Sequence, residues 1–133
     1  MQVIQSKYDA LHFNFSSGKS IYLQLAEKLE LLIVSGAFEK GERLPSIREF
    51  ALYIKVNPNT LQKSLALLEE AKLIRTDRTN GKFVTDDPDL IERKKVELAK
   101  RAVDSFFLEM QQIGFDRAEA KKLLNKGFSN EEF

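Results

Sequence analysis

Residues 43–63 read RLPSIREFALYIKVNPNTLQK, and this stretch contains two helix starts in close succession. Ser46 followed by Glu49 is the pattern of a capping box, in which the serine hydroxyl accepts a hydrogen bond from the first turn and the glutamate reaches back to the serine amide. Asn57 followed by Pro58 is a second start, because asparagine is a good N-cap and proline suits the first helical position. Two short helices separated by a tight polar break predict a helix-turn-helix.

The apolar residues of both helices recur at the spacing of one helix face, which predicts a buried stripe on each helix. The stripes consist of Ile47, Phe50, Ala51 and Ile54, and of Leu61, Leu65 and Leu68. The polar residues at the start of the second helix therefore fall on or beside its outer face. They are Asn59, Thr60, Gln62 and Lys63. Such side chains can hydrogen-bond base edges or phosphates, so this face is a candidate nucleic-acid reader.

A further helix is predicted ahead of this stretch, over residues 21–35, from its apolar spacing. Ser20 can cap its start, and Gly36 can end it in the left-handed conformation. Residues 1–19 are weakly patterned, and we expect them to form an N-terminal arm or an added strand.

A β-hairpin is predicted behind the helix-turn-helix. Residues 73–77 and 82–85 alternate between apolar and polar like strands, and Asn80-Gly81 between them supplies the positive φ angles of a tight turn. The hairpin would form a wing. The sequence therefore predicts a mainly α fold with a small β-hairpin, a winged helix-turn-helix over residues 20–86.

Residues 87–133 predict a separate helical segment. Asp89, directly after Pro88, can cap a helix from Leu90 to about Ile113. This helix carries two adjacent apolar stripes, so we expect it to have two packing partners. The two stripes include Val96, Val103, Phe106, Phe107 and Met110.

A short last helix completes a helical hairpin in this segment. Gly114 ends the long helix, and Asp116 with Glu119 repeats the capping-box pattern. The short helix then holds Leu123 and is expected to end at Gly127. We interpret residues 87–133 as a second unit of the chain, a helical hairpin.

Composition excludes several classes of protein. The chain has 133 residues, 43% hydrophobic and 31% charged, no cysteine and one histidine, which rules out disulfides and a zinc finger. No apolar run approaches the roughly 20 residues that span a bilayer, and the N-terminus lacks a signal-peptide pattern, so the cytoplasm is the expected location. No nucleophile and base converge and no phosphate-cradling glycine loop is present, so we expect neither an enzyme nor a cofactor or metal.

Charge is unevenly distributed, although the net charge is only +1. Residues 43–82 contain eight basic and four acidic side chains, a surplus of four positive charges. Residues 86–133 contain nine basic and eleven acidic side chains, a surplus of two negative charges. The helix-turn-helix and wing therefore suit a polyanion such as DNA, and the C-terminal segment does not.

Five motifs in this order resemble the GntR family of transcription regulators. They are residues 21–25 (IYLQL), 35–36 (SG), 41–49 (GERLPSIRE), 56–60 (VNPNT) and 81–84 (GKFV). The resemblance covers residues 20–85 and implies a sequence-specific regulator that binds double-stranded DNA. Two positions depart from the family pattern: Lys55 replaces a glycine in the turn, and the wing sequence Arg78-Thr79-Asn80-Gly81 has one glycine where the family usually has two.

The resemblance implies DNA contacts at the starts of both helices and in the wing. The positions that match are Ser46, Arg48, Asn57, Asn59, Thr60, Gln62, Lys63 and Gly81, to which we add the wing cations Arg78 and Lys82. Their chemistry agrees, because arginine can grip a phosphate or fork onto guanine and the amides of Asn59 and Gln62 suit adenine. Thr60 and Lys63 are better suited to phosphate.

The short segment after the wing is similar to the YtrA-type branch of that family. The resemblance implies that residues 87–133 are a dimerisation segment whose helices pair two subunits, and the candidate dimer-interface residues are Val96, Val103, Phe106, Phe107 and Met110. A two-fold dimer would act as a repressor on an inverted-repeat operator. Such regulators often accompany transporter genes, an association that the resemblance alone implies. A small-molecule effector has room only in a crevice beside the helical hairpin or at a dimer seam, and the sequence does not locate it. The alternative hypothesis is a winged-helix interaction module that binds protein or RNA.

Overall fold

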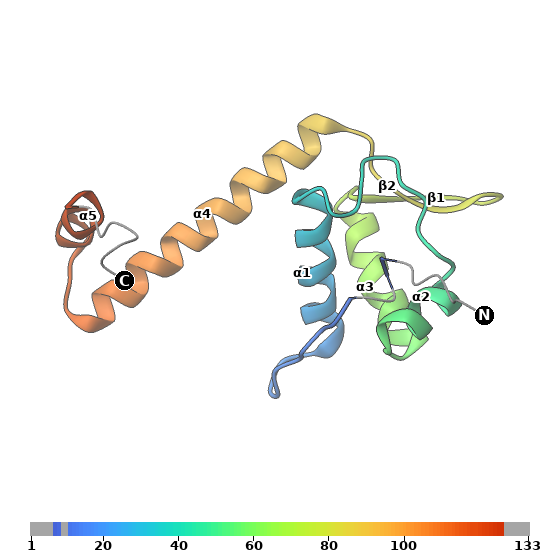
Figure 1. Ribbon diagram of the computed structural model, residues 1–133, viewed down its shortest axis with the longest axis horizontal. Helices are drawn as coiled ribbons and strands as arrows, with labels where there is room; N and C mark the ends of the chain where they lie inside the picture. Colours follow the sequence, from blue (N-terminus) through green and yellow to red (C-terminus); the bar gives the residue numbers. More distant parts are fainter. Residues whose placement is uncertain (1–6, 9–10, 127–133) are drawn as a thin grey trace, which may run out of the picture. The chain divides into compact units, whose positions relative to one another are not determined.

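The computed structural model describes residues 7–8 and 11–126, and in this part of the chain it contains five helices and one antiparallel hairpin (Figure 1). The elements are α1 (Ile21–Val34), α2 (Ile47–Ile54), α3 (Pro58–Glu70), β1 (Ile74–Asp77), β2 (Gly81–Val84), α4 (Pro88–Ile113) and α5 (Arg117–Asn125). The predicted mainly α fold with a small β-hairpin is confirmed. The chain forms two compact units, divided within α4 between Arg93 and Lys94.

The core of the first unit lies between α1, α2, α3 and the hairpin. Its fully buried side chains include Leu25, Leu29, Ile33, Phe50, Leu61, Leu65, Leu73 and Val84. The apolar stripes of the sequence therefore do face a common core. Gly36 ends α1 with φ +86°, as predicted, but Ser20 occupies the N-cap position of α1 without a side-chain hydrogen bond.

Helix α2 starts at the predicted cap, Ser46, but the Glu49 side chain bonds to a different group from the one predicted. The Glu49 N–H donates to Ser46 Oγ at 3.2 Å, which is the first half of a capping box. The second half is absent, because the Glu49 carboxylate accepts from the Ser46 hydroxyl at 3.0 Å instead of from the Ser46 amide. Lys55 ends α2 in the left-handed conformation, with φ +58°, at the position where the family pattern has glycine.

Helix α3 begins as expected at Pro58, and the Asn57 side chain accepts a 2.8 Å hydrogen bond from the Asn59 N–H. Its buried face contains Ser64 in addition to the predicted leucines. The Ser64 hydroxyl donates to the Tyr22 carbonyl oxygen in α1 at 2.7 Å, so a buried polar contact joins the two helices.

The wing has a different turn from the one predicted. Asp77 pairs with Gly81, which leaves a three-residue loop of Arg78, Thr79 and Asn80. Within residues 77–81 only Gly81 has a positive φ, whereas the predicted turn needed one at Asn80 as well. The Asp77 carboxylate organises the loop by accepting hydrogen bonds from the Thr79 N–H and hydroxyl, both 2.9 Å, and from the Asn80 amide. These hydrogen bonds lower the pKa of Asp77 to about 2.

The segment ahead of α1 packs on the core instead of forming an added strand in its described part. Tyr8, Leu11, Phe13 and Phe15 all contact the core cluster. The Tyr8 ring lies 5.4 Å from Phe38 and 5.3 Å from Phe50, measured between ring centroids. The arm is therefore part of the first unit.

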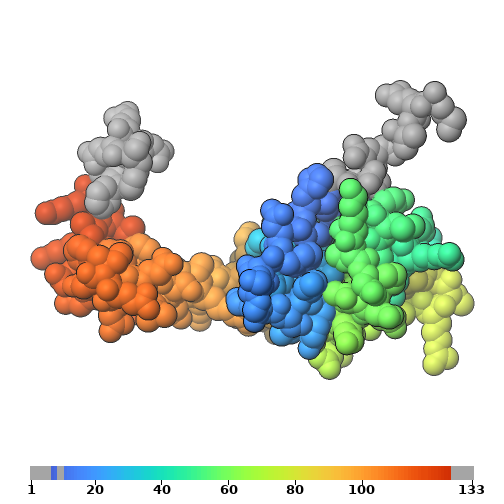
Figure 2. All heavy atoms as spheres, turned by 90° about the horizontal axis from the view of Figure 1, so that it is seen from below, coloured from blue at the N-terminus to red at the C-terminus, as the bar shows by residue number. Residues whose placement is uncertain are grey.

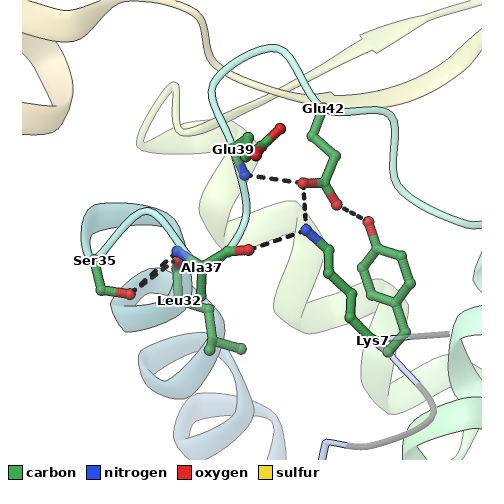
Figure 3. A network of polar contacts seen from close by, with 7 residues as sticks. Lys7, Leu32, Ser35, Ala37, Glu39 and Glu42 are labelled. Atoms are coloured by element: carbon green, nitrogen blue, oxygen red, sulfur yellow. Dashed lines mark hydrogen bonds and ion pairs between the residues drawn. The ribbon is translucent and has the colours of Figure 1, made fainter.

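Polar contacts of the arm converge on Glu42, in the link between α1 and α2 (Figure 3). Lys7 donates from Nζ to Glu42 Oε1 at 2.6 Å, the Tyr8 hydroxyl donates to Oε2, and the Glu39 N–H donates to Oε1 at 2.9 Å. Burial by itself would raise the pKa of Glu42, but the hydrogen bonds from Lys7, Tyr8 and the Glu39 N–H hold that pKa below its ordinary value.

The second unit contains the rest of α4 and α5. The helix α4 itself begins in the first unit, at Pro88, two residues before the predicted Leu90. Its cap is Asp87, whose carboxylate accepts a hydrogen bond from the Asp89 N–H at 3.0 Å. The prediction of Asp89 as the cap was therefore wrong. The second capping box, Asp116 with Glu119, is complete. Gly127, the expected end of α5, lies outside the described residues.

Candidate nucleic-acid interface

The start of α3 presents its polar side chains to solvent. Asn59, Gln62 and Lys63 are exposed and Thr60 is half-buried, while Leu61, Ser64 and Leu65 between them face the core. Asn57 is exposed as well, but its side-chain oxygen is engaged by the cap of α3. The amides of Asn59 and Gln62 make no hydrogen bond within the described part of the chain, so their donors and acceptors are available to a base edge.

Lys63 is oriented by a neighbour in α1. Its Nζ lies 5.7 Å from the centroid of the Tyr22 ring, a cation–π contact that holds the ammonium beside the amino-terminal turn of α1. The charge remains exposed and has no carboxylate partner among the described residues. This arrangement suits a phosphate contact better than a base contact.

The start of α2 contributes an exposed arginine and a serine. Arg48 makes no ion pair within the described residues, so its guanidinium keeps its hydrogen-bond donors. The Ser46 hydroxyl is exposed but already joined to Glu49. Arg48 is therefore the group at this helix start that is available for a ligand.

The wing protrudes from the first unit (Figure 2, yellow) and carries Arg78 at its tip, exposed and without a carboxylate partner in the described chain. Gly81 follows the tip with φ +101°. An added Cβ at Gly81 would strain the backbone there, since side-chain-bearing residues rarely adopt this conformation. The glycine is thus required by the wing turn itself.

Lys82, a predicted DNA contact of the wing, is paired with a carboxylate of its own chain. Its ammonium forms an ion pair with Glu69 of α3 and a 2.9 Å hydrogen bond with the Thr76 hydroxyl. Burial would raise the pKa of Glu69, but the hydrogen bonds from Lys82 and Thr76 keep that pKa below its ordinary value. The charge of Lys82 is therefore compensated inside the protein, and its first role is to join the wing to α3.

A cleft of about 650 Å³ separates the wing from the start of α2. Its lining includes Arg43, Ser46, Glu49, Arg78 and Gly81. The cleft thus lies between the start of α2 and the wing, both of which carry predicted DNA contacts. Arg43 was not among the residues singled out in the sequence, because its only signals are a positive charge and its place in the motif GERLPSIRE.

The predicted dimer-interface residues lie on α4. Val96 and Val103 are 46% and 50% exposed, and Phe106, Phe107 and Met110 are half-buried. In the second unit an apolar hollow of about 300 Å³ is lined by Ala102, Val103, Phe106, Phe107 and Leu124. The Phe107 ring also stacks under the Arg117 guanidinium at 4.2 Å, so this side chain has a partner within its own chain.

Neither a metal-binding cluster nor a membrane-spanning helix is found among the described residues. They contain no group of three or more histidine, cysteine or acidic side chains that could hold a metal ion. In the same part of the chain, no helix combines the length and the hydropathy needed to cross a membrane.

Comparisons with known proteins identify what the chain is similar to. The family model described as bacterial regulatory proteins, gntR family, matches residues 21–84. The HTH-type transcriptional regulator YhcF of Bacillus subtilis is 32% identical over 105 residues, which cover 79% of this chain and 87% of that protein. The HTH-type transcriptional repressor YtrA of Bacillus subtilis is 32% identical over 97 residues, 68% of this chain and 75% of that protein.

A solved structure is also similar over most of the chain. A GntR family transcriptional regulator from Listeria monocytogenes superposes with a TM-score of 0.76 at 35% sequence identity. The match covers 85% of this chain and 99% of that chain.

Proposed function

Since the chain belongs to the gntR family of bacterial regulatory proteins, and is thus a DNA-binding transcription regulator and not an enzyme, we propose that it is a cytoplasmic repressor that binds an inverted-repeat operator as a homodimer. The observation that carries this proposal is the start of α3, where Asn59, Gln62 and Lys63 are exposed beside a buried leucine stripe. The polar, exposed face of such a helix can enter a major groove while its apolar face stays packed on the core.

Specific contacts are assigned from the chemistry of the exposed groups. Gln62 and Asn59 read base edges, Arg48 forks onto a guanine or a phosphate, and Lys63 holds a phosphate. Thr60 and Ser46 add hydrogen bonds to the backbone, and Arg78 with Gly81 places the wing in the adjacent minor groove. Lys82 contributes less than the other cations, because binding DNA would require it to leave Glu69.

The repressor assignment is supported by the relative YtrA, which is named as a repressor. The homodimer is supported by the apolar face of α4, where Val96 and Val103 are about half exposed. A two-fold dimer would place two α3 helices in successive major grooves, about 34 Å apart, so the operator half-sites should lie about one helical turn apart. Occupancy of the operator would then block transcription.

The test starts with selection of bound fragments from a random DNA library by the full chain, which yields the operator and its half-site spacing. Gel-shift titrations on that operator should show that Arg48→Ala and Gln62→Ala each weaken binding by about 1–3 kcal/mol if each reads a base. Lys63→Ala should weaken binding on all sequences and reduce the salt slope by about one unit. The matched control is Gln112→Ala, an exposed glutamine of α4.

Unchanged affinity in all three interface variants would contradict the assignment. Selection of RNA instead of duplex DNA from a mixed library would favour the alternative function, a winged-helix module that binds RNA. A selected operator without two-fold symmetry would contradict the homodimer.

A further inference from the structure

We propose that Arg43 is a further DNA-contacting residue, which holds a backbone phosphate at the cleft between the start of α2 and the wing. The inference rests on the proposed function, because it adds a contact to the same interface. It concerns a position outside both helices of the helix-turn-helix, in the link that leads from α1 to α2. Four features of the structure support it: the anchored backbone, the direction of the side chain, its unpaired charge and its place between the start of α2 and the wing.

The backbone of Arg43 is fixed to the wing. Arg43 and Phe83 form an antiparallel bridge, flanked by hydrogen bonds from the Leu44 N–H to the Lys82 carbonyl oxygen and from the Val84 N–H to the Glu42 carbonyl oxygen, both 2.8 Å. Residues 42–44 therefore run along β2 like a short third strand. A side chain on such a segment is positioned by the wing instead of moving with a loose loop.

The side chain of Arg43 lies beside the wing turn. A Cβ built on Gly81 would be 3.6 Å from Arg43 Nε and 3.8 Å from an Nη, so the guanidinium lies next to the first residue of β2. Successive side chains of an extended segment point to opposite faces. Glu42 accordingly bonds to Lys7 and Tyr8 of the arm (Figure 3) and does not line the cleft, whereas Arg43 does, together with the Tyr8 side chain.

The charge of Arg43 is not neutralised by the carboxylates around it. Glu42 is occupied by Lys7, Tyr8 and the Glu39 N–H. Two carboxylates line the same cleft and form hydrogen bonds with neutral groups, Asp77 within its own loop and Glu49 with Ser46, and neither forms an ion pair with Arg43. Within the described residues Arg43 forms no ion pair, and its side chain is exposed.

A phosphate is the ligand group that fits this position. The cleft separates the start of α2 from the wing, and in a duplex the sugar-phosphate backbone separates the major groove from the minor groove. If α3 occupies the major groove and the wing the adjacent minor groove, the intervening phosphates must pass this cleft. The planar guanidinium fork matches two phosphate oxygens, so an arginine here neutralises one phosphate and sets the register of the wing.

The test compares Arg43→Gln with the wild-type chain in titrations at several salt concentrations. Two duplexes are used, the selected operator and an unrelated sequence. We expect roughly tenfold weaker binding to both duplexes, because a charge-assisted hydrogen bond is lost, and a salt slope smaller by about one unit. The control Lys40→Gln removes an exposed cation three residues earlier that does not line the cleft, and it should leave the slope unchanged.

A second measurement identifies the phosphate that Arg43 contacts, and it begins with the wild type alone. Operators are made with single neutral methylphosphonate groups along the backbone. One such group should weaken binding of wild type and have no further effect on Arg43→Gln. A full salt slope in Arg43→Gln, with Gln62→Ala and Lys63→Ala still impaired, overturns the Arg43 inference alone. Failure of the wild type to bind any duplex overturns both this inference and the proposed function.

Discussion

The hydroxyl of Ser64, on the buried face of α3, donates a 2.7 Å hydrogen bond to the carbonyl oxygen of Tyr22 in α1. Ser64 is 0% exposed, and the same hydroxyl oxygen lies 3.0 Å from the Thr60 carbonyl oxygen. The Lys63 ammonium also lies over the Tyr22 ring, in a cation–π contact. Two consecutive residues of α3 therefore contact one residue of α1, which fixes the rotation of α3 and with it the direction of Asn59 and Gln62.

Replacement of Ser64 by Ala should lower the free energy of unfolding by about 1–2 kcal/mol, because a buried hydrogen bond to a backbone carbonyl is lost. Chemical denaturation followed by circular dichroism measures the change. Ser105→Ala, at an exposed position of α4, is the control and should change stability by less than about 0.5 kcal/mol. Equal effects of the two substitutions would contradict a structural role for the Ser64 hydroxyl.

Replacement of Lys55 by Gly should stabilise the first unit by about 1 kcal/mol. Lys55 has φ +58° and ψ +49°, a conformation that costs a side-chain-bearing residue about 1–2 kcal/mol and glycine little. The expected result is a higher denaturation midpoint. Lys55→Ala removes the same charge and retains the Cβ, so it should not stabilise; if it does, charge and not backbone strain is the cause.

Replacement of Glu42 by Gln should destabilise the protein by about 1–2 kcal/mol near neutral pH, since the carboxylate accepts hydrogen bonds from Lys7 and Tyr8. The pKa of Glu42 is lower in the folded protein than its ordinary value of 4.5, which the unfolded chain retains. The contribution of Glu42 is therefore fully present above about pH 4.5 and is lost as the pH falls through the lowered pKa.

Unfolding curves of wild type and Glu42→Gln at a series of pH values measure this difference. The gap between the two proteins should narrow as the medium is acidified below pH 4.5. Tyr8→Phe should retain the ring contacts with Phe38 and Phe50 and lose part of the same gap. A gap that is constant from neutral to acidic pH would show that the carboxylate contributes no charge-dependent stability.

Replacement of Val103 by Glu should convert the proposed homodimer to monomers without unfolding the chain. Val103 is 50% exposed and lines the apolar hollow of the second unit, so a charge at this position costs little in the monomer and much at a dry interface. Phe107→Glu is less suitable alone, because that ring also packs against Arg117. Sedimentation of wild type and Val103→Glu, with Lys100→Glu as an exposed control on the same helix, checks the expectation.

The sequence alone determined the order and type of the elements, because their signals are local. Ser46, Asn57 and Asp116 each cap a helix within one turn of the chain, and Gly36 ends α1 by its own backbone freedom. The apolar stripes act at a range of three or four residues. The exposed start of α3 follows directly from its leucine spacing, so the main part of the candidate site could be predicted too.

Only the tertiary structure decided which charges of the site are free. Lys82 is bound to Glu69 of another element and Arg43 is left without a carboxylate partner among the described residues, and no spacing rule distinguishes the two cations. Likewise, Tyr8 reaches Glu42 across 34 positions of sequence. Such pairings depend on where distant segments meet in space, which the local spacing of residues does not encode.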